Sequence, residues 1–169
     1  MASVTDTDHG ARALTERLQS LARAHAVVRV GILEKDGSAA RPAPDRKKGE
    51  GDAIGEALTI IEIAVCNEFG LGVPERSFIR GWFDQNEADL REKLSKVMAP
   101  VARGERTTQQ ALDRFGLWCV GQIQARISRH GDGTYAENAP RTIAEKGSSA
   151  PLIDTGLMRS AISHEVEVK

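Results

Sequence analysis

Two short stretches with the period of a β-strand, far apart in the chain, constrain the fold more than any other feature of this sequence. Residues 26–33, AVVRVGIL, are rich in β-branched residues and place Val28, Val30 and Ile32 on one face. Residues 162–168 alternate Ile, His and Val with Ser and Glu, which is typical of a half-buried strand. The stretches between them have mainly helical patterns. The sequence therefore predicts an α+β fold, with a small sheet and about four to five helices in a single domain.

Between the two strands, apolar side chains recur at helical spacing. The clearest helix follows a cap candidate at residues 84–87, and a longer one follows a cap candidate at residues 107–110. Asn138 is the expected cap of a brief helix that ends at Gly147. The apolar stripe of the helix after residues 84–87 consists of Leu90, Leu94, Val97, Met98 and Val101. The stripe of the helix after residues 107–110 consists of Leu112, Phe115, Cys119, Ile123 and Ile127.

The residues before the first strand also have a helical period. In residues 11–25, Leu14, Leu18, Leu21 and Ala22 fall on one stripe. This pattern predicts an amphipathic first helix.

Residues 58–65 fit two structures. Thr59 and Glu62 have the spacing of a capping box, which predicts a helix that Gly70 closes. The same residues are rich enough in β-branched side chains to form a strand, and this alternative stays open.

Residues 34–53 combine Gly, Pro, Ser and basic side chains with almost nothing to bury, which predicts a long exposed loop. Loops of about 20 residues are uncommon in compact domains unless they have a function, so a contact role is expected. The loop carries a cluster of positive charge that is a possible phosphate contact; its members are Arg41, Arg46, Lys47 and Lys48. A DNA-contacting module is one alternative function, and a solvated loop tip is the other interpretation.

Composition argues against several classes of protein. The 23 Lys and Arg nearly balance the 24 Asp and Glu, whereas a dedicated nucleic-acid binder normally carries a net positive charge. Cys66 and Cys119 lie in apolar runs and are expected to be buried thiols in a reducing compartment. No apolar run approaches the roughly 20 residues of a membrane helix, and no secretory leader is expected.

No set of residues predicts an enzyme. Asp154, Thr155 and Gly156 form the triplet of an aspartic protease, but that chemistry needs a second carboxylate, and the sequence has no second triplet. Asp154 or Thr155 is instead expected to cap a helix that begins at Leu157. The four histidines lack metal-ligand spacing, and the glycines near residue 50 lack dinucleotide-loop spacing. Neither a cofactor nor a metal is therefore expected.

Two segments carry a family resemblance. The first is CNEFGLGVPERSFIRGWFD, residues 66–84, and the second is TIAEKGSSAPLIDTGLMRSAI, residues 142–162. Together they resemble the tailed-bacteriophage neck and tail-completion family, small virion morphogenesis proteins of the head–tail junction. Ser77 departs from the family pattern, where a second Pro is common. The matching residues are Asn67, Glu68, Phe69, Gly70, Pro74, Glu75, Arg76, Phe78 and Arg80 in the first segment, and Lys146, Gly147, Pro151, Leu152, Asp154, Thr155, Gly156, Leu157 and Arg159 in the second.

The resemblance implies a non-enzymatic structural protein of the virion, assembled in the cytoplasm of the host bacterium. Copies of the chain would form a ring that contacts connector and tail proteins close to genomic DNA, without a membrane. Another tail-assembly role, such as a tail terminator, is the alternative within this class. Arginines beside aromatic residues are typical of interface hot spots, although Phe78 and Trp82 fit the chain's own core equally well. The expected interface consists of Asn67, Glu68, Phe69, Pro74, Arg76, Phe78, Arg80, Trp82 and Arg159.

Overall fold

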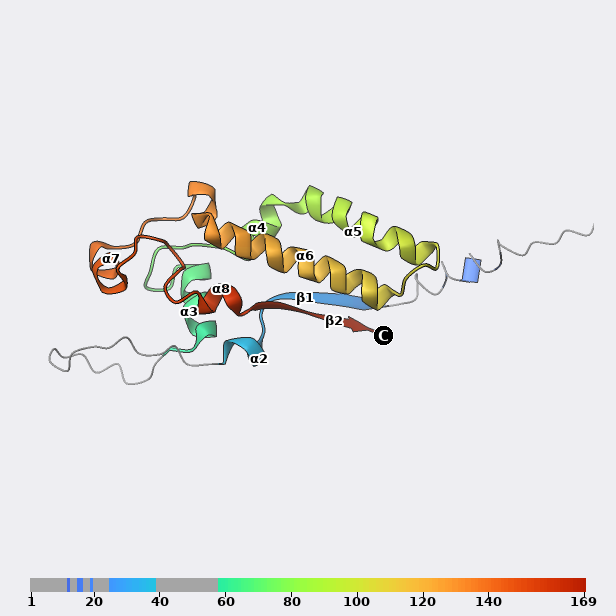
Figure 1. The fold of residues 1–169 in the computed structure, drawn as a ribbon, viewed down its shortest axis with the longest axis horizontal. Coiled ribbons are helices and arrows are strands. Elements are labelled where there is room, and N and C mark those ends of the chain that lie inside the picture. Colours follow the sequence, from blue (N-terminus) through green and yellow to red (C-terminus); the bar gives the residue numbers. More distant parts are fainter. Residues whose placement is uncertain (1–11, 13–14, 17–18, 20–24, 39–57) are drawn as a thin grey trace, which may run out of the picture.

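The computed structural model describes residues 12, 15, 16, 19, 25–38 and 58–169 (Figure 1). Residues 25–38 and 58–169 contain two strands, seven α-helices and one 3-10 helix. In chain order these are β1 (Ala26–Ile32), α2 (Glu34–Gly37), α3 (Ile60–Phe69), α4 (Arg80–Gln85), α5 (Glu87–Ala102), α6 (Thr108–Ser128), the 3-10 helix η1 (His130–Gly133), α7 (Pro140–Lys146), α8 (Leu157–Ser160) and β2 (Ile162–Val168).

The two strands pair with each other as an antiparallel sheet. Ala26 lies opposite Val168, and Ile32 lies opposite Ile162. Both predicted strands and the α+β class are therefore confirmed. The described residues contain more helices than expected, because α2 and α4 have only four and six residues and are too short to produce a helical period in the sequence.

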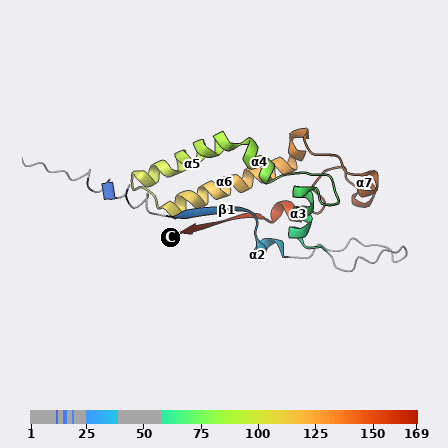
Figure 2. The same ribbon diagram turned by 180° about the vertical axis from the view of Figure 1, so that it is seen from behind.

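Helix α6 lies along one face of the sheet, and α5 lies along the opposite side of α6 (Figures 1 and 2). Helix α6 approaches the sheet closely at Gly116, which faces the ring of His164 in β2. A Cβ atom at position 116 would lie 2.4 Å from His164 Cδ2. The absence of a side chain at Gly116 therefore allows the imidazole to lie against the helix.

This contact leads to a prediction with a control on the same helix. We expect Gly116→Ala to lower the free energy of unfolding by about 1–3 kcal/mol, because the added methyl group would overlap the His164 ring. A Cβ atom at Gly121 would meet nothing within 4 Å. Gly121→Ala should therefore raise stability by about 0.5–1 kcal/mol through helix propensity. Urea unfolding followed by circular dichroism measures both changes, and a shift of the same sign in the two variants would contradict the packing described.

The hydrophobic core includes both aromatic residues whose place the sequence left open. Phe78 is 0% exposed and Trp82 is 4% exposed. Trp82 packs edge-on against Phe83 and Trp118, with ring centroids 4.9 Å and 5.8 Å apart. Of the two alternatives, an interface or the chain's own core, Phe78 and Trp82 lie in the core. Further members of this core include Ile60, Ala64, Cys119, Val120, Ile123, Ile127 and Ile162.

The two cysteines are free thiols in different surroundings. Cys119 is buried, and its burial raises the pKa of the thiol to about 11, so the group stays protonated at neutral pH. Cys66 is only half-buried. The prediction of a buried thiol is confirmed for Cys119 and is wrong for Cys66, whose position on α3 leaves part of the side chain at the surface.

Two helix starts follow the predicted local chemistry. The Thr59 hydroxyl accepts the Glu62 N–H, and the Glu62 carboxylate accepts the Thr59 N–H at 2.7 Å. Residues 60–69 are therefore helical, and the strand alternative for 58–65 is excluded. Gly70 ends α3 with a φ of 70°, a conformation that suits glycine. Thr107 forms the same reciprocal cap at the start of α6.

Two predicted caps are corrected. Within the cap candidate 84–87, the first residue, Asp84, lies inside α4, and the N-cap of α5 is Asn86, whose side-chain amide donates to the Trp82 carbonyl at 2.8 Å. A short helix before α5 displaces the expected start. Ala139, and not Asn138, holds the cap position of α7. The Asn138 side chain is engaged elsewhere in the fold.

Two predictions fall largely outside the described residues. Of the predicted first helix, residues 12, 15, 16 and 19 are described, and they are helical and exposed. The predicted loop over residues 34–53 is wrong at its beginning, because α2 forms there and its Asp36 carboxylate accepts the Ser163 hydroxyl at 2.5 Å. The rest of this loop lies outside the described residues.

Candidate functional site

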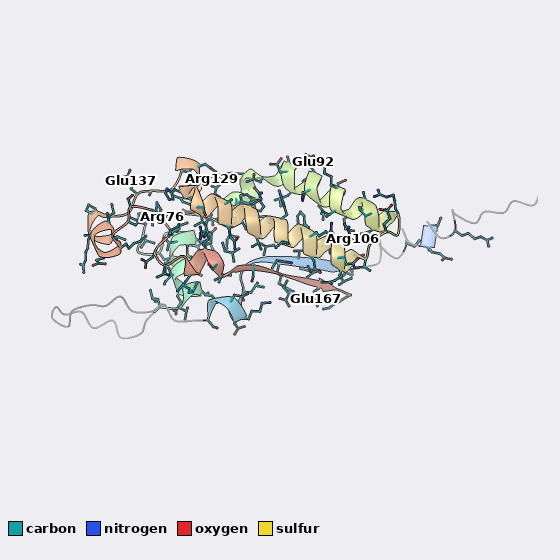
Figure 3. The ribbon with its side chains drawn as sticks, viewed as in Figure 1. Arg76, Glu92, Arg106, Arg129, Glu137 and Glu167 are labelled. Carbon is teal, nitrogen blue, oxygen red and sulfur yellow. The ribbon has the colours of Figure 1, made fainter. Side chains whose placement is uncertain are left out.

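The two segments that carry the family resemblance meet at one end of the molecule. Helices α3, α7 and α8 gather there, at the opposite end from the start of β1 and the end of β2 (Figures 1 and 2). Arg76 and Glu137 lie at this end (Figure 3). Residues distant in the sequence are joined here by buried polar side chains.

Glu68 is the first of these side chains. It is 7% exposed and extends from α3 to the start of α4. Its Oε1 accepts the Ser77 hydroxyl at 2.6 Å and the Arg80 N–H at 2.8 Å. Its Oε2 accepts the N–H groups of Phe78 at 2.9 Å and Ile79 at 3.0 Å. Glu68 thus caps α4 from another helix, since Ile79, at the cap position, makes no side-chain cap bond.

Arg76 is the second, at 5% exposed. Its Nε donates to the Ala136 carbonyl at 2.8 Å, and its Nη2 donates to the Glu137 carbonyl at 2.9 Å. Further bonds run to the Asn67 and Asn138 side-chain oxygens, at 3.2 Å and 3.3 Å. All four acceptors are neutral amide oxygens, and desolvation lowers the pKa of Arg76 from its usual value. The guanidinium thus links α3 to residues 136–138.

Asn138 extends this network to the second motif. Its side-chain amide donates to the carbonyls of Ser149 and Ala150, both at 3.1 Å. The Lys146 ammonium also donates to the Ala150 carbonyl, at 2.9 Å. These bonds hold residues 149–150 beside α7 and bring the second motif next to the first.

A cleft of about 520 Å³ lies between the two motifs. Ile60, Ile63 and Met158 form part of its apolar wall, and Asn67, Arg76 and Asn138 contribute polar groups. Its rim contains four apolar side chains that are 39–56% exposed, and we call them the apolar rim. They are Leu58, Leu71, Val73 and Leu157.

Helix α8 begins differently from the prediction. Gly156 holds its cap position with a φ of 81°, so the position belongs neither to Asp154 nor to Thr155. The Thr155 hydroxyl accepts the Leu157 N–H at 3.4 Å, a long bond. The helix ends at Ser160 because β2 starts two residues later. Asp154 and Thr155 instead line the cleft.

The predicted interface separates into buried and accessible residues. Glu68, Arg76, Phe78 and Trp82 are buried among residues of their own chain, so the expectation that they reach a neighbouring subunit is corrected. Asn67 and Arg159 are half-buried, and Arg159 donates to the Ser128 hydroxyl at 2.9 Å. Phe69, Pro74 and Arg80 are exposed.

Arg80 and Phe69 form a small exposed group within the first motif. The Arg80 guanidinium carbon lies 5.1 Å from the centre of the Phe69 ring. The Glu75 carboxylate accepts from Arg80 at 2.6 Å. Both Phe69 and Arg80 thus present accessible surface, as a contact role requires.

Three further expectations concern a phosphate contact, a metal site and a membrane helix. Arg41, Arg46, Lys47 and Lys48 lie outside the described residues. Within the part that is described, no group of three or more His, Cys, Asp or Glu side chains is placed to hold a metal ion. None of the described helices is long and apolar enough to cross a membrane.

Comparison with known proteins adds no relative. No family model matches the sequence, and no curated protein and no solved structure matches it. Functional inference therefore depends on the two motifs and on the geometry around the cleft.

The sequence did not reveal the apolar rim. Leu71 and Val73 stand between Gly70 and Pro74, a stretch expected only as an extended connection. Two apolar residues in such a turn could have indicated the apolar rim, because a turn that only connects two helices is usually polar.

Proposed function

We propose that this chain is a structural subunit of a tailed-phage virion, which forms a ring at the head–tail junction and joins the tail to the connector. The observation that carries the proposal is the convergence of both family motifs on one cleft with an apolar rim. Leu58, Leu71, Val73 and Leu157 line this cleft and are exposed, and Asn67, Arg76 and Asn138 line it too. A contiguous apolar patch with polar neighbours is typical of a protein contact site.

The charge of the chain supports a protein partner over a nucleic-acid partner. A net charge of -1 gives no general attraction to DNA. A ring requires two different patches on each copy, one of which binds the other on the next copy. The cleft is a candidate for one of them.

A joining assay tests this function. Lysates of the encoding phage that lack this protein should contain separate heads and tails. Adding the purified chain should restore joined particles, counted by negative-stain electron microscopy, and should restore the plaque titre. Heads and tails that join equally well without the chain, or that stay separate after its addition, would contradict the proposal.

Arg80 provides a prediction at the accessible part of the motif. We expect Arg80→Glu to lower joining at least tenfold and to leave the unfolding midpoint nearly unchanged. The side chain is half exposed, and reversal of its charge places a carboxylate beside Glu75 at a contact surface. The joining assay and thermal unfolding measure the two effects. Arg91→Glu, on the exposed surface of α5, is the matched control and should join normally.

A further inference from the structure

The two ends of the molecule differ in what they offer a second copy. The cleft and its apolar rim lie at the end formed by α3, α7 and α8 (Figures 1 and 2). Strand β1 begins at the other end, so residues before Ala26 join the described fold far from the cleft. Each copy therefore has an apolar cleft at one end and its N-terminal segment attached at the other.

The sequence of that segment suits an apolar cleft. Leu14, Leu18 and Leu21 have the i, i+4, i+7 spacing with which an amphipathic helix fills a groove. The described residues of the segment, 12, 15, 16 and 19, are helical, exposed and polar. Residue 12 precedes the leucines and the other three fall between them, so the leucine stripe is the apolar side of the segment. A cleft of about 520 Å³ is within the range of roughly 300–1,000 Å³ that encloses apolar ligands.

The outer face of the chain's own sheet is a poor site for this stripe. On the side away from α6, Arg29 pairs with the Glu167 carboxylate at 3.1 Å, and Glu165 lies opposite Arg29. An apolar stripe placed there would remove these charges from water without new partners, which is unfavourable.

The distance along the chain also favours another copy's cleft. The stripe ends at Ala22, and the three residues before β1 extend at most roughly 10 Å. The seven residues of β1 span roughly 23 Å, and helices α3 and α7, which contribute residues to the cleft, lie beyond the far end of the strand (Figure 1). A segment attached next to Ala26 is therefore better placed to meet a neighbour.

We propose that the N-terminal segment of one copy, residues 11–25, occupies the cleft of the next copy through Leu14, Leu18 and Leu21. This inference rests on the proposed function, because it names the contact by which ring subunits join. The contact uses two different patches, so it runs head to tail and closes a ring if the rotation between copies allows. The apolar rim around Leu71 and Leu157 is the surface that the leucines cover.

Two full-length variants test the contact from both sides. The segment variant carries Leu14→Asp and Leu18→Asp, and the rim variant carries Leu71→Asp and Leu157→Asp. The unmodified chain should self-associate in light scattering coupled to size exclusion over a concentration series. Each variant alone should associate more than a hundredfold more weakly, since each buried leucine contributes about a tenfold effect or more.

Mixing the two variants distinguishes head-to-tail contact from other modes. The segment variant keeps an intact cleft, and the rim variant keeps an intact segment. An equimolar mixture should therefore form a complex of two chains and nothing larger. Leu117→Asp is the matched control, because Leu117 is an apolar residue of α6 that is 63% exposed and does not line the cleft. It should assemble like the unmodified chain.

Three results would overturn the inference. They are normal assembly of either variant, failure of the mixture to form the two-chain complex, and a monomeric unmodified chain at every concentration. Normal assembly of a variant would show that the subunits join through another contact, and it would leave the ring proposal intact. The joining assay tests the proposed function independently. Circular dichroism checks folding, and Val73→Asp replaces the rim variant if that variant is unfolded, since Val73 is another exposed rim residue.

Discussion

Glu68→Gln is expected to lower the free energy of unfolding by about 2–4 kcal/mol. Each carboxylate oxygen of Glu68 accepts two hydrogen bonds. Three of these four bonds come from backbone N–H groups at the start of α4. Glutamine has nearly the same size, but its NH2 group replaces one acceptor and faces a buried N–H donor. An unsatisfied buried donor costs about 1–3 kcal/mol, and the loss of the buried charge adds to this.

The matched control for Glu68 is Glu75→Gln in the same motif. Glu75 is more than half exposed and pairs with Arg80 in solvent, so its replacement should change stability little. Urea unfolding of both variants measures the difference. Equal stability of the two variants would mean that the cap on α4 contributes little. Hydrogen exchange at residues 78–80 locates the effect, because these N–H groups should exchange faster in Glu68→Gln alone.

Arg76→Lys is expected to cost about 2–4 kcal/mol, although the charge is kept. The planar guanidinium donates from three nitrogens to four amide oxygens on two separate parts of the chain. A lysine ammonium is a single point and cannot reproduce this fork. The carbonyls of Ala136 and Glu137 and the Asn138 side chain would lose donors inside the protein. Faster hydrogen exchange over residues 136–150 should accompany the loss of stability.

Arg80→Lys is the control for this experiment, since Arg80 is half exposed and its ion pair lies in solvent. It should unfold at nearly the same urea concentration as the unmodified chain. If Arg76→Lys behaved like this control, the network around Arg76 would not hold the cleft wall. The two comparisons, Glu68→Gln with Glu75→Gln and Arg76→Lys with Arg80→Lys, distinguish two parts of the motif. The buried part stabilises the fold, and the exposed part remains available for contacts.

The sequence predicts elements whose partners are close along the chain. Thr59 and Thr107 each exchange bonds with a residue three positions later, so the caps of α3 and α6 are readable from spacing alone. The second strand was also predicted with the correct bounds and the first to within one residue, because alternation over seven residues is a local pattern.

The candidate site was only partly predictable, because its bonds join distant positions. Glu68 reaches residues nine to twelve positions away, and Arg76 reaches residues about sixty positions away. No local pattern specifies such partners. An arginine next to aromatic residues fits an interface and a buried network equally well in sequence, and burial decides between them. The same limit applies to Asn138, where local chemistry predicted a cap and tertiary bonds use the side chain elsewhere.

The pairing of β1 with β2 determines when the sheet can form during synthesis. Residues 26–32 leave the ribosome well before residues 162–168, their only partner in the described sheet, which are made after nearly all of the other described residues. A two-stranded sheet of such high contact order forms slowly, after helices that need only nearby residues. During synthesis, the edge of β1 that pairs with β2 therefore stays unpaired until β2 is released. Unpaired strand edges favour aggregation, so the interval before β2 is made is the one in which the nascent chain most needs protection.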